Sequence, residues 1–592
     1  MVRLDTLDWI IVAVILGISL SIGVLVSRRA GASSSSFFLS GRSMPWWLLG
    51  TSMVATTFST DTPNLVAEIV RTNGVSGNWI WWAFLITGMF TCFLYARMWR
   101  RSGAMTDLEF YELRYSGGAS TFLRVFRALY LGVFFNIMTM ALVSLAAIKI
   151  AAVMLGFSPI QTLLIAGTVT LIFSTLGGFL GVVLTDLILF VISMTGAILA
   201  ATVALNLPEV NGLQNLLSHP DVASKLSFIP DFSNMEVALA VFIIPLAVQW
   251  WSVWYPGAEP GGGGYVAQRM LAARNERDAV GAVLLFQVAH YAIRPWPWIL
   301  VALASIVVFP DLDSIRVAFP HVDSKVVGHD MAYPAMLTFL PSGLLGFVFA
   351  SLIAAYMSTM SSQLNWGASY VVNDVYKRFI SPDAGEKRLV LVGRLATVVL
   401  MIAAGMFALF LESALQAFHI LLSVGAGTGL LFLLRWFWWR INAASEIVAM
   451  VVSFFAALYF QFADLPGWSP YLKLISGIAV TTVAWVLAAY LGPRTKTEVL
   501  EKFCRELRPQ GPGWSAVRKH MPASFEGEAD DNISDNIPAA LLNVFVGCLS
   551  VYAMLFGVGY TVYGNYVAAV ALLLVGSVGI GFLVHNLRRV PG

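Results

Sequence analysis

The sequence predicts an all-α polytopic membrane protein, and three observations support this prediction. Of the 592 residues, 58% are hydrophobic and only 12% are charged, about half the charged share of a typical soluble domain. The apolar residues form runs of about 20, the length that a helix needs to cross a bilayer. Basic residues collect between alternate runs. Lipid rather than a water-soluble core therefore surrounds most of this chain.

About fifteen apolar runs are long enough for membrane-spanning helices. If the N-terminus lies outside, most of the 36 Lys and Arg residues fall in cytoplasmic loops, as the positive-inside rule requires. We therefore expect a multi-pass protein of the plasma membrane, of the bacterial inner-membrane type, with the N-terminus outside and the C-terminus in the cytoplasm. The runs lie near 8–27, 45–70, 77–97, 123–155, 159–178, 180–206, 236–258, 279–309, 341–372, 388–411, 413–437, 443–463, 469–491, 537–558 and 563–586.

Two of these runs contain helix-breaking residues. The second carries Pro63 within residues 59–64, and the seventh ends in Pro256, Pro260 and the four glycines 261–264. Proline lacks the N–H that a helix needs, and glycine weakens a helix. A break inside a bilayer is tolerated only where protein or a watery cavity receives the freed backbone groups. The alternative is that one break is a kink and the other is the start of a loop.

The two interrupted runs are five apart, so corresponding helices have opposite orientations in the membrane. This is the arrangement of a five-plus-five inverted repeat that binds its solute at the broken helices. We expect one membrane domain in which the repeats are flanked by additional helices. Its sections are an N-terminal helix and loop (1–44), a first repeat (45–206), an extracellular loop (207–235), a second repeat (236–437), two further helices (438–491), a cytoplasmic segment (492–536) and two C-terminal helices (537–592).

The cytoplasmic segment begins with a stretch whose apolar residues have helical spacing, TKTEVLEKFCRELRP at 495–509. Such a pattern is typical of an amphipathic helix on a membrane surface. A solvated linker between the core and the last two helices is the alternative.

Four ordered motifs resemble those of a known family. They are FLSGRSMPWW at 38–47, Gly177-Gly178 followed by Thr185-Asp186, Gln268-Arg269 followed by LAAR at 271–274, and AAYMSTMSS at 354–362. Together, over about residues 8–490, they resemble the sodium:solute symporter family, which has the leucine-transporter (LeuT) type fold. The resemblance implies one extra N-terminal helix, a ten-helix core and about four further helices.

The resemblance also implies a sodium site at the first break. Its ligands would be the carbonyl oxygens of Ala55, Phe58 and Ala355 and the hydroxyls of Ser358 and Thr359. Sodium is a hard cation, and hydroxyls and free carbonyls supply the oxygen ligands that it prefers. Phe58 stands where relatives often have an aliphatic residue, but its carbonyl is unchanged. Apart from the family resemblance, the alternative is that both hydroxyls bond carbonyls of their own helix.

Some relatives bind a second sodium ion. The residue types that they use are present here as Asp186, Ser361 and Ser362, so the resemblance allows a second sodium site. An ionisable residue inside a span is a functional candidate. Asp186 could alternatively be a proton-linked carboxylate or a structural ion-pair partner.

Candidate solute contacts come from the two breaks and the helices that face them. A buried Arg294 needs a partner, which Asp61, Glu259 or an anionic solute could supply. The full set is Thr57, Asp61, Thr62, Asn78, Glu259, Tyr265, Tyr291, Arg294, Gln416 and His419.

The family resemblance does not indicate which solute this chain carries. Tyr265 resembles the inner-gate tyrosine of the sugar-carrying branch, but the lysine and glutamine with which sugar carriers hold their ligand have no clear counterpart. A sugar, a sugar acid or another small polar metabolite all remain open.

We expect sodium-coupled symport of such a solute by alternating access, with Na⁺ as the only metal. The alternatives are a proton-coupled carrier and a solute sensor built on a transporter fold. An enzyme is not expected, because the chain has no HExxH or GxSxG motif. The expected partners are a small-molecule solute and the lipid bilayer, without nucleic acid; the pattern does not indicate an oligomeric state.

Overall fold

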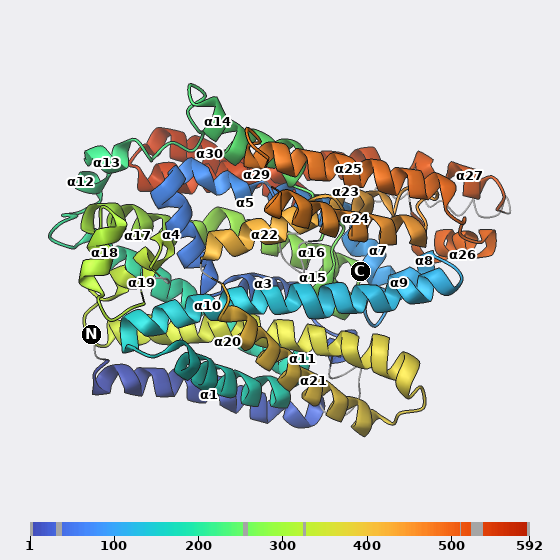
Figure 1. The fold of residues 1–592 in the computed structure, drawn as a ribbon, viewed down its shortest axis with the longest axis horizontal. Coiled ribbons are helices and arrows are strands. Elements are labelled where there is room, and N and C mark those ends of the chain that lie inside the picture. Colours follow the sequence, from blue (N-terminus) through green and yellow to red (C-terminus); the bar gives the residue numbers. More distant parts are fainter. Residues whose placement is uncertain are drawn as a thin grey trace.

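The structure, a computed structural model, is helical throughout. It describes residues 4–30, 38–252, 259–323, 327–411, 413–463, 465–509, 511–521 and 537–588. Within these ranges no β-strand forms, and one isolated bridge joins Met44 to Ala273. The all-α prediction is confirmed, and Figure 1 shows long helices lying side by side along the longest axis of the molecule.

Ten helices of the described chain are long and apolar enough to cross a membrane. The expected number of about fifteen is not confirmed, because broken spans fall below the length of a full crossing. The ten are Val75–Ser102, Gly118–Leu155, Phe179–Leu205, Glu276–Val308, Leu344–Ile380, Glu386–Ala408, Ala443–Phe460, Pro470–Leu491, Ile537–Val562 and Tyr566–Leu587, and shorter apolar helices occupy Thr6–Ile22, Pro159–Thr175 and Met235–Gln249.

The first predicted break is present. Helix α3 (Trp46–Thr57) ends at Phe58, whose φ of −87° and ψ of 85° leave the helical region, and α4 (Asp61–Asn73) begins three residues later. The break precedes Pro63, which lies in the first turn of α4. The first four N–H groups of a helix have no partner within the helix, so the missing N–H of this proline costs little there.

The second predicted break is present as well. The seventh run consists of a short helix and two π-helical turns, the last being η7 (Pro245–Gln249), and helix resumes only in α15 (Gly264–Ala272). Residues 253–258, which include Pro256, lie outside the described residues. Gly261 and Gly262 have φ of 87° and 80°, a backbone conformation that favours glycine. The glycine run therefore forms the turn between the two halves.

The predicted boundary near 178–180 is not a break in the helix. Helix α11 (Pro159–Leu205) continues through it for 47 residues, a length of about 70 Å if straight against a hydrocarbon core of about 30 Å. The two crossings expected there therefore share one helix. The other close pair of runs is separated as expected, because α21 (Glu386–Ala408) ends well before α22 (Ala414–Ala426) begins.

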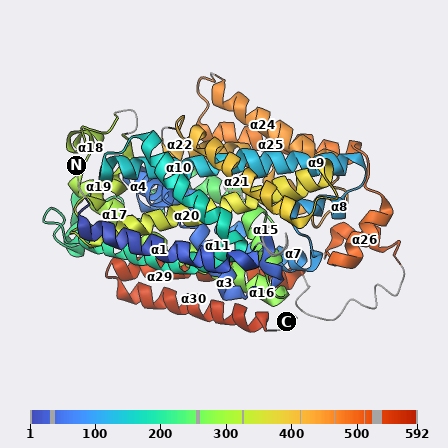
Figure 2. The same cartoon turned by 90° about the horizontal axis from the view of Figure 1, so that it is seen from below.

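The segment predicted to be cytoplasmic does form a helix, α26 (Thr497–Leu507), but protein covers its apolar face. Leu500, Phe503, Cys504 and Leu507 are buried, and the Phe503 ring stacks on Trp514 with the centroids 5.2 Å apart. Because these side chains already pack within the protein, they are not available to a membrane surface. Helices α26 and α27 (Ser515–Arg518) lie at one end of the molecule, opposite α12 (Leu213–Ser218) and α18 (Leu312–Ala318) (Figures 1 and 2).

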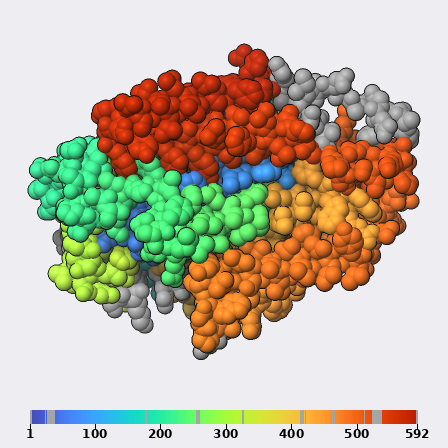
Figure 3. Space-filling view, turned by 90° about the horizontal axis from the view of Figure 1, so that it is seen from above, coloured from blue at the N-terminus to red at the C-terminus, as the bar shows by residue number. Residues whose placement is uncertain are grey.

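Helices outside the expected core flank it on two sides. Helix α1 (Thr6–Ala30) packs against α11 and α20 (Leu344–Tyr370). Helices α29 (Ile537–Val562) and α30 (Tyr566–Leu587) pack mainly on each other and form the ridge along one face in Figure 3. Both groups leave the broken helices enclosed at the centre.

Candidate functional site

The end of α3 is joined to the middle of α20 by side-chain hydroxyls. The Thr359 hydroxyl donates to the carbonyl oxygen of Thr56 at 2.8 Å, and the Thr56 hydroxyl lies 2.9 Å from that of Ser362. All three residues are buried. The first break therefore faces α20 directly, as the predicted sodium site requires.

The five residues predicted to bind sodium lie on the two helices that meet at this contact. Ala55 and Phe58 are in the last turn and C-cap of α3, and Ala355, Ser358 and Thr359 occupy neighbouring turns of α20. Each is at most 2% exposed, so a cation here would be shielded from bulk water. The non-helical ψ of Phe58 turns its carbonyl out of the helical direction. Carbonyl and hydroxyl oxygens are the ligand types that sodium prefers, and the sodium site stays a prediction.

Asp186 supports this site from α11. Its carboxylate accepts hydrogen bonds from the Ser358 hydroxyl at 2.6 Å and from the Ser52 hydroxyl at 2.5 Å. Because Ser358 donates its proton to Asp186, the lone pairs of its oxygen are left for a cation.

Arg269 reaches the residues predicted for a second sodium ion. Its terminal nitrogen donates to the Ser362 hydroxyl at 2.8 Å and lies 3.7 Å from the Asp186 carboxylate. The Ser361 hydroxyl is buried without a hydrogen-bond partner among the described residues. Arg269 is thus a partner for Asp186 in the ion-pair role, one of the three roles considered for this residue. The second sodium site stays a prediction.

A small cavity of about 30 Å³ lies directly beside the first break. Thr57, Asp61, Thr62 and Arg294, all predicted solute contacts, line it. The Arg294 guanidinium donates to the Thr57 hydroxyl at 2.9 Å, and Asp61 accepts from Ser59. The remaining lining residues are Ser59, Leu65, Val66, Trp81, Leu142, His290, Phe418 and Leu421.

Two further candidates lie just behind this lining. The Asn78 side chain accepts a hydrogen bond from the Trp81 indole at 2.9 Å, and the Tyr291 ring stacks on Trp81 with the centroids 5.8 Å apart. Both therefore position a lining residue. Tyr265 is buried in α15, 5.4 Å from the Arg269 guanidinium to its ring centre.

The other candidates do not line this cavity. His419 is exposed, and the side chain of Gln416 lies outside the part of the chain that the structure describes. Glu259 pairs with Arg127 and Arg435 rather than with Arg294.

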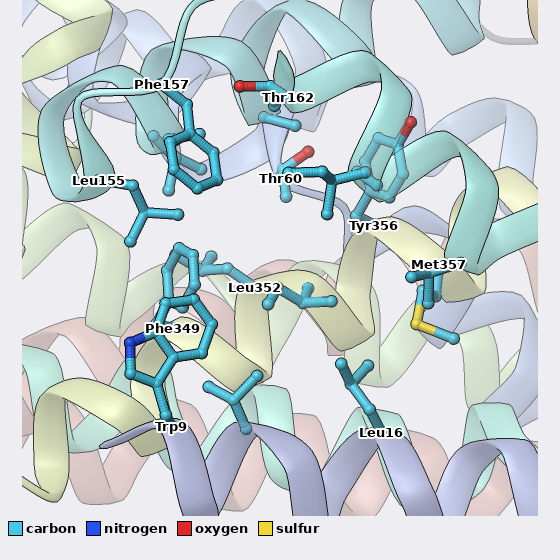
Figure 4. A pocket seen from close by; sticks show the side chains of 18 residues that line it. Trp9, Leu16, Thr60, Leu155, Phe157, Thr162, Phe349, Leu352, Tyr356 and Met357 are labelled. Carbon is cyan, nitrogen blue, oxygen red and sulfur yellow. The ribbon is translucent and has the colours of Figure 1, made fainter. Parts of the chain in front are cut away.

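A second, larger cavity of about 150 Å³ lies between α1, α10 (Asn136–Leu155), α11 and α20 and reaches Thr60 at the first break (Figure 4). Figure 4 shows mostly apolar side chains around it. The Thr60 hydroxyl donates to the Val143 carbonyl at 3.0 Å, and the Thr162 hydroxyl to the Ser158 carbonyl at 3.1 Å. With these groups already bonded, the lining does not suit a polar solute.

Sequence reasoning missed the supporting residues of the site. Ser52, Thr56 and Ser59 are short hydroxyl residues close to Ala55 and Phe58 in sequence, and their proximity to the break was a usable signal. No sequence signal links Arg269 to Asp186, or Arg127 and Arg435 to Glu259, because each pair joins segments far apart in the chain.

Comparisons with known proteins identify the family of this chain. The profile of the sodium:solute symporter family matches residues 37–453. A sodium/glucose cotransporter of Vibrio parahaemolyticus is 29% identical over 480 residues, covering 78% of this chain and 86% of that protein. An osmoregulated proline transporter of Bacillus subtilis (strain 168) is 24% identical over 400 residues, covering 66% of this chain and 75% of that protein.

Among solved structures, the substrate-bound outward-open state of a Na⁺-coupled sialic acid symporter superposes with a TM-score of 0.68 at 21% identity, covering 83% of this chain and 99% of that one. This likeness confirms the LeuT-type fold. Because the family match extends over most of the chain and its relatives are transporters rather than enzymes, this polytopic membrane protein belongs to the sodium:solute symporter family.

Proposed function

We propose that this protein is a secondary active transporter that couples the inward movement of sodium to the uptake of a small polar solute. The observation that carries the proposal is the contact between the end of α3 and α20, where the Thr359 hydroxyl meets the Thr56 carbonyl at 2.8 Å. Oxygen atoms freed by a broken helix, buried next to two hydroxyl residues, are what a desolvated sodium ion needs.

The solute would bind at the small cavity one turn from this contact. Arg294 and Asp61 supply one positive and one negative group, Thr57 and Thr62 supply hydroxyls, and Trp81 supplies an aromatic face. Such a lining suits a polar molecule with hydroxyl groups, a sugar or a sugar acid among them. The sodium/glucose and sodium/myo-inositol cotransporters that resemble this chain are compatible with this class.

In the proposed cycle, sodium links Ala55 and Phe58 to Ser358 and Thr359 and thereby holds α3 against α20. This contact favours the state that is open to the outside and orders the adjacent solute cavity. Solute binding then closes the outer side, and both leave to the cytoplasm. The membrane potential contributes about 2.3 kcal/mol per sodium ion for each 100 mV.

The test begins with a thermal-shift screen of polar metabolites in sodium and in potassium buffer. Uptake of a radiolabelled hit into proteoliposomes, with and without an inward sodium gradient, then measures coupling. We expect accumulation only with the gradient. Uptake driven equally by a proton gradient in potassium buffer would support the proton-coupled alternative, and binding without uptake would support the sensor alternative.

Ser358→Ala tests the sodium site, and Ser369→Ala is its matched control. Both serines are buried in α20, but the Ser369 hydroxyl only bonds the Trp366 carbonyl of its own helix, at 2.6 Å. Loss of one ligand of a cation should raise the half-saturating sodium concentration about tenfold, which corresponds to about 1.4 kcal/mol. Ser369→Ala should stay within about twofold. Equal effects of the two substitutions would remove Ser358 from the site.

A further inference from the structure

Glu259 lies in the turn between the two halves of the second broken helix, and two arginines hold its carboxylate. Arg435 donates to one oxygen at 2.9 Å, and Arg127 pairs with the other. The side chains of all three residues are at most 3% exposed. Two arginines on one buried carboxylate form a strong, directional contact.

The two arginines come from elements outside the broken helix. Arg127 belongs to α9 (Gly118–Leu129), and Arg435 follows α23 (Gly429–Leu434). Arg435 also pairs with Glu446 of α24 (Ala443–Phe462) at 3.3 Å. The contact therefore ties the turn of the second broken helix to three helices of the surrounding scaffold.

Further bonds hold the same turn. The Trp99 indole donates to the Gly261 carbonyl at 2.6 Å, and the Gly264 N–H donates to the Asp107 carboxylate at 2.9 Å. Gly261, Gly262 and Gly264 all have positive φ, so the turn includes three residues that can change conformation at low cost. A firmly held but intrinsically flexible turn has the character of a movable closure.

The charges explain how the closure can be both stable and reversible. Arg127, Arg435, Glu259 and Glu446 together carry no net charge, and a balanced network can remain buried. Yet the Nε–H groups of Arg127 and Arg435 are buried without an acceptor among the described residues. Water that reaches the network would accept hydrogen bonds from these donors. These new bonds offset part of the free energy that is lost when the ion pairs separate.

The opposite end of the molecule is closed by contacts of its own. The Glu68 carboxylate of α4 accepts from the Leu415 N–H of α22 at 3.1 Å, and Lys149 pairs with Asp330 at 2.6 Å. The solute cavity of about 30 Å³ lies by the break between α3 and α4. Contacts between separate elements are thus present at both ends of the molecule, and the Glu259 network occupies the end predicted to be cytoplasmic.

We propose that the ion pairs of Glu259 with Arg127 and Arg435 form a latch that keeps the cytoplasmic side of the transport path closed. These ion pairs must break before the solute can leave. The proposal rests on the transport function proposed above, and it assigns Glu259 to gating rather than to solute binding. Arg127 and Arg435 are the fixed half of the latch, and the glycine turn is the moving half.

The test uses a reporter cysteine, so it requires no knowledge of the solute. Thr91 is buried, and its methyl carbon would lie 3.1 Å from a Cβ placed on Gly262, so it is covered by the turn. Thr91→Cys is placed in a chain whose cysteines 92, 504 and 548 are replaced by alanine. The rate of modification by a membrane-impermeant maleimide is then measured in inside-out vesicles.

Glu259→Gln should raise this rate about tenfold over the parent, because the amide cannot hold two guanidinium groups. Glu276→Gln is the matched control. Glu276 likewise binds two arginines, Arg97 and Arg101, each at 3.0 Å, but it lies at the start of α16 (Glu276–Gln287) and not in the turn. The control should stay within twofold of the parent.

A second variant separates opening from misfolding. Glu259→Gln combined with Arg127→Gln leaves Arg435 and Glu446 as a balanced pair, so its melting temperature should return towards that of the parent while the reporter still reacts fast. Parent-like reactivity in both variants, or an equal rise in Glu276→Gln, overturns the latch. Absence of sodium-dependent uptake in the unaltered chain would instead overturn the proposed function, because the maleimide rate does not depend on transport.

Discussion

At the scale of single residues, Thr359 is the side chain whose two groups have separable roles. Its hydroxyl bonds the Thr56 carbonyl, and its methyl group is buried with the rest of the side chain. Thr359→Val keeps the shape and removes the oxygen, and Thr359→Ser keeps the oxygen and removes the methyl. If the oxygen binds sodium, Thr359→Val should raise the half-saturating sodium concentration at least tenfold, whereas Thr359→Ser should change it less than threefold.

Sodium binding can be measured directly for these two variants with ²²Na⁺ and purified protein. The melting temperature serves as the control for folding. A valine variant that binds sodium like the parent would show that the hydroxyl only joins the two helices.

The Asp186–Arg269 pair gives a second residue-level prediction. Asp186→Asn leaves the Arg269 guanidinium buried next to a neutral amide, and breaking a buried ion pair from one side destabilises a protein by about 3–5 kcal/mol. We expect a clearly lower melting temperature and, because Asp186 also bonds Ser358, weaker sodium binding. Asp186→Asn with Arg269→Gln should recover much of the melting temperature without restoring sodium affinity.

Residue roles were predictable from the sequence only where a local feature reported them. Thr57, Asp61 and Thr62 were identifiable because the residues at 59–64 predict the break locally. All three line the cavity. Glu259 also stands at a break, but its partners are 132 and 176 positions away. Its pairing depends on how the helices pack, which no local pattern records.

At the scale of elements, α1 is more than a peripheral helix. The Asp8 carboxylate accepts hydrogen bonds from the N–H groups of Gly343 and Gly346, at 2.8 and 2.7 Å, and so caps the start of α20 from another helix. A cap satisfies donors that a helix cannot satisfy itself. Since α20 carries Ser358 and Thr359, the extra helix supports the helix that bears the candidate sodium site.

Asp8→Ala should therefore destabilise the protein by about 1 kcal/mol, the usual value of a cap, and Asp8→Asn should cost less because its amide oxygen can still accept. The melting temperatures of the two variants check this order. The reverse order, or no change in Asp8→Ala, would show that α20 does not depend on this cap.

The sequence predicted which elements exist better than where they divide. Proline and glycine runs located both breaks, because they act on the backbone locally. The boundary at 178–180 was wrong since glycines there interrupt the apolar pattern but not the helix. The apolar face of α26 was correctly read as amphipathic, yet hydropathy cannot distinguish a lipid surface from the aromatic side chains that cover it here.

At the scale of the whole molecule, charge distribution and architecture agree. The basic residues of 494–519 belong to the end that holds α26 and α27, whereas α12 and α18 lie at the other end (Figures 1 and 2). Loops rich in Lys and Arg stay in the cytoplasm during insertion. We therefore expect α26 and the Glu259 latch on the cytoplasmic side, and Lys149 with Asp330 on the outside.

This orientation can be tested with single cysteines in the cysteine-free chain. Ser233 and Lys519 are both exposed; Ser233 lies in the predicted extracellular loop 207–235 and Lys519 in the predicted cytoplasmic segment 492–536. A maleimide that does not cross membranes should modify Ser233→Cys in intact cells, but Lys519→Cys only after permeabilisation. The opposite pattern would reverse the molecule in the membrane: the Glu259 latch would then close the outer side, and the direction of solute movement proposed here would have to be reversed with it.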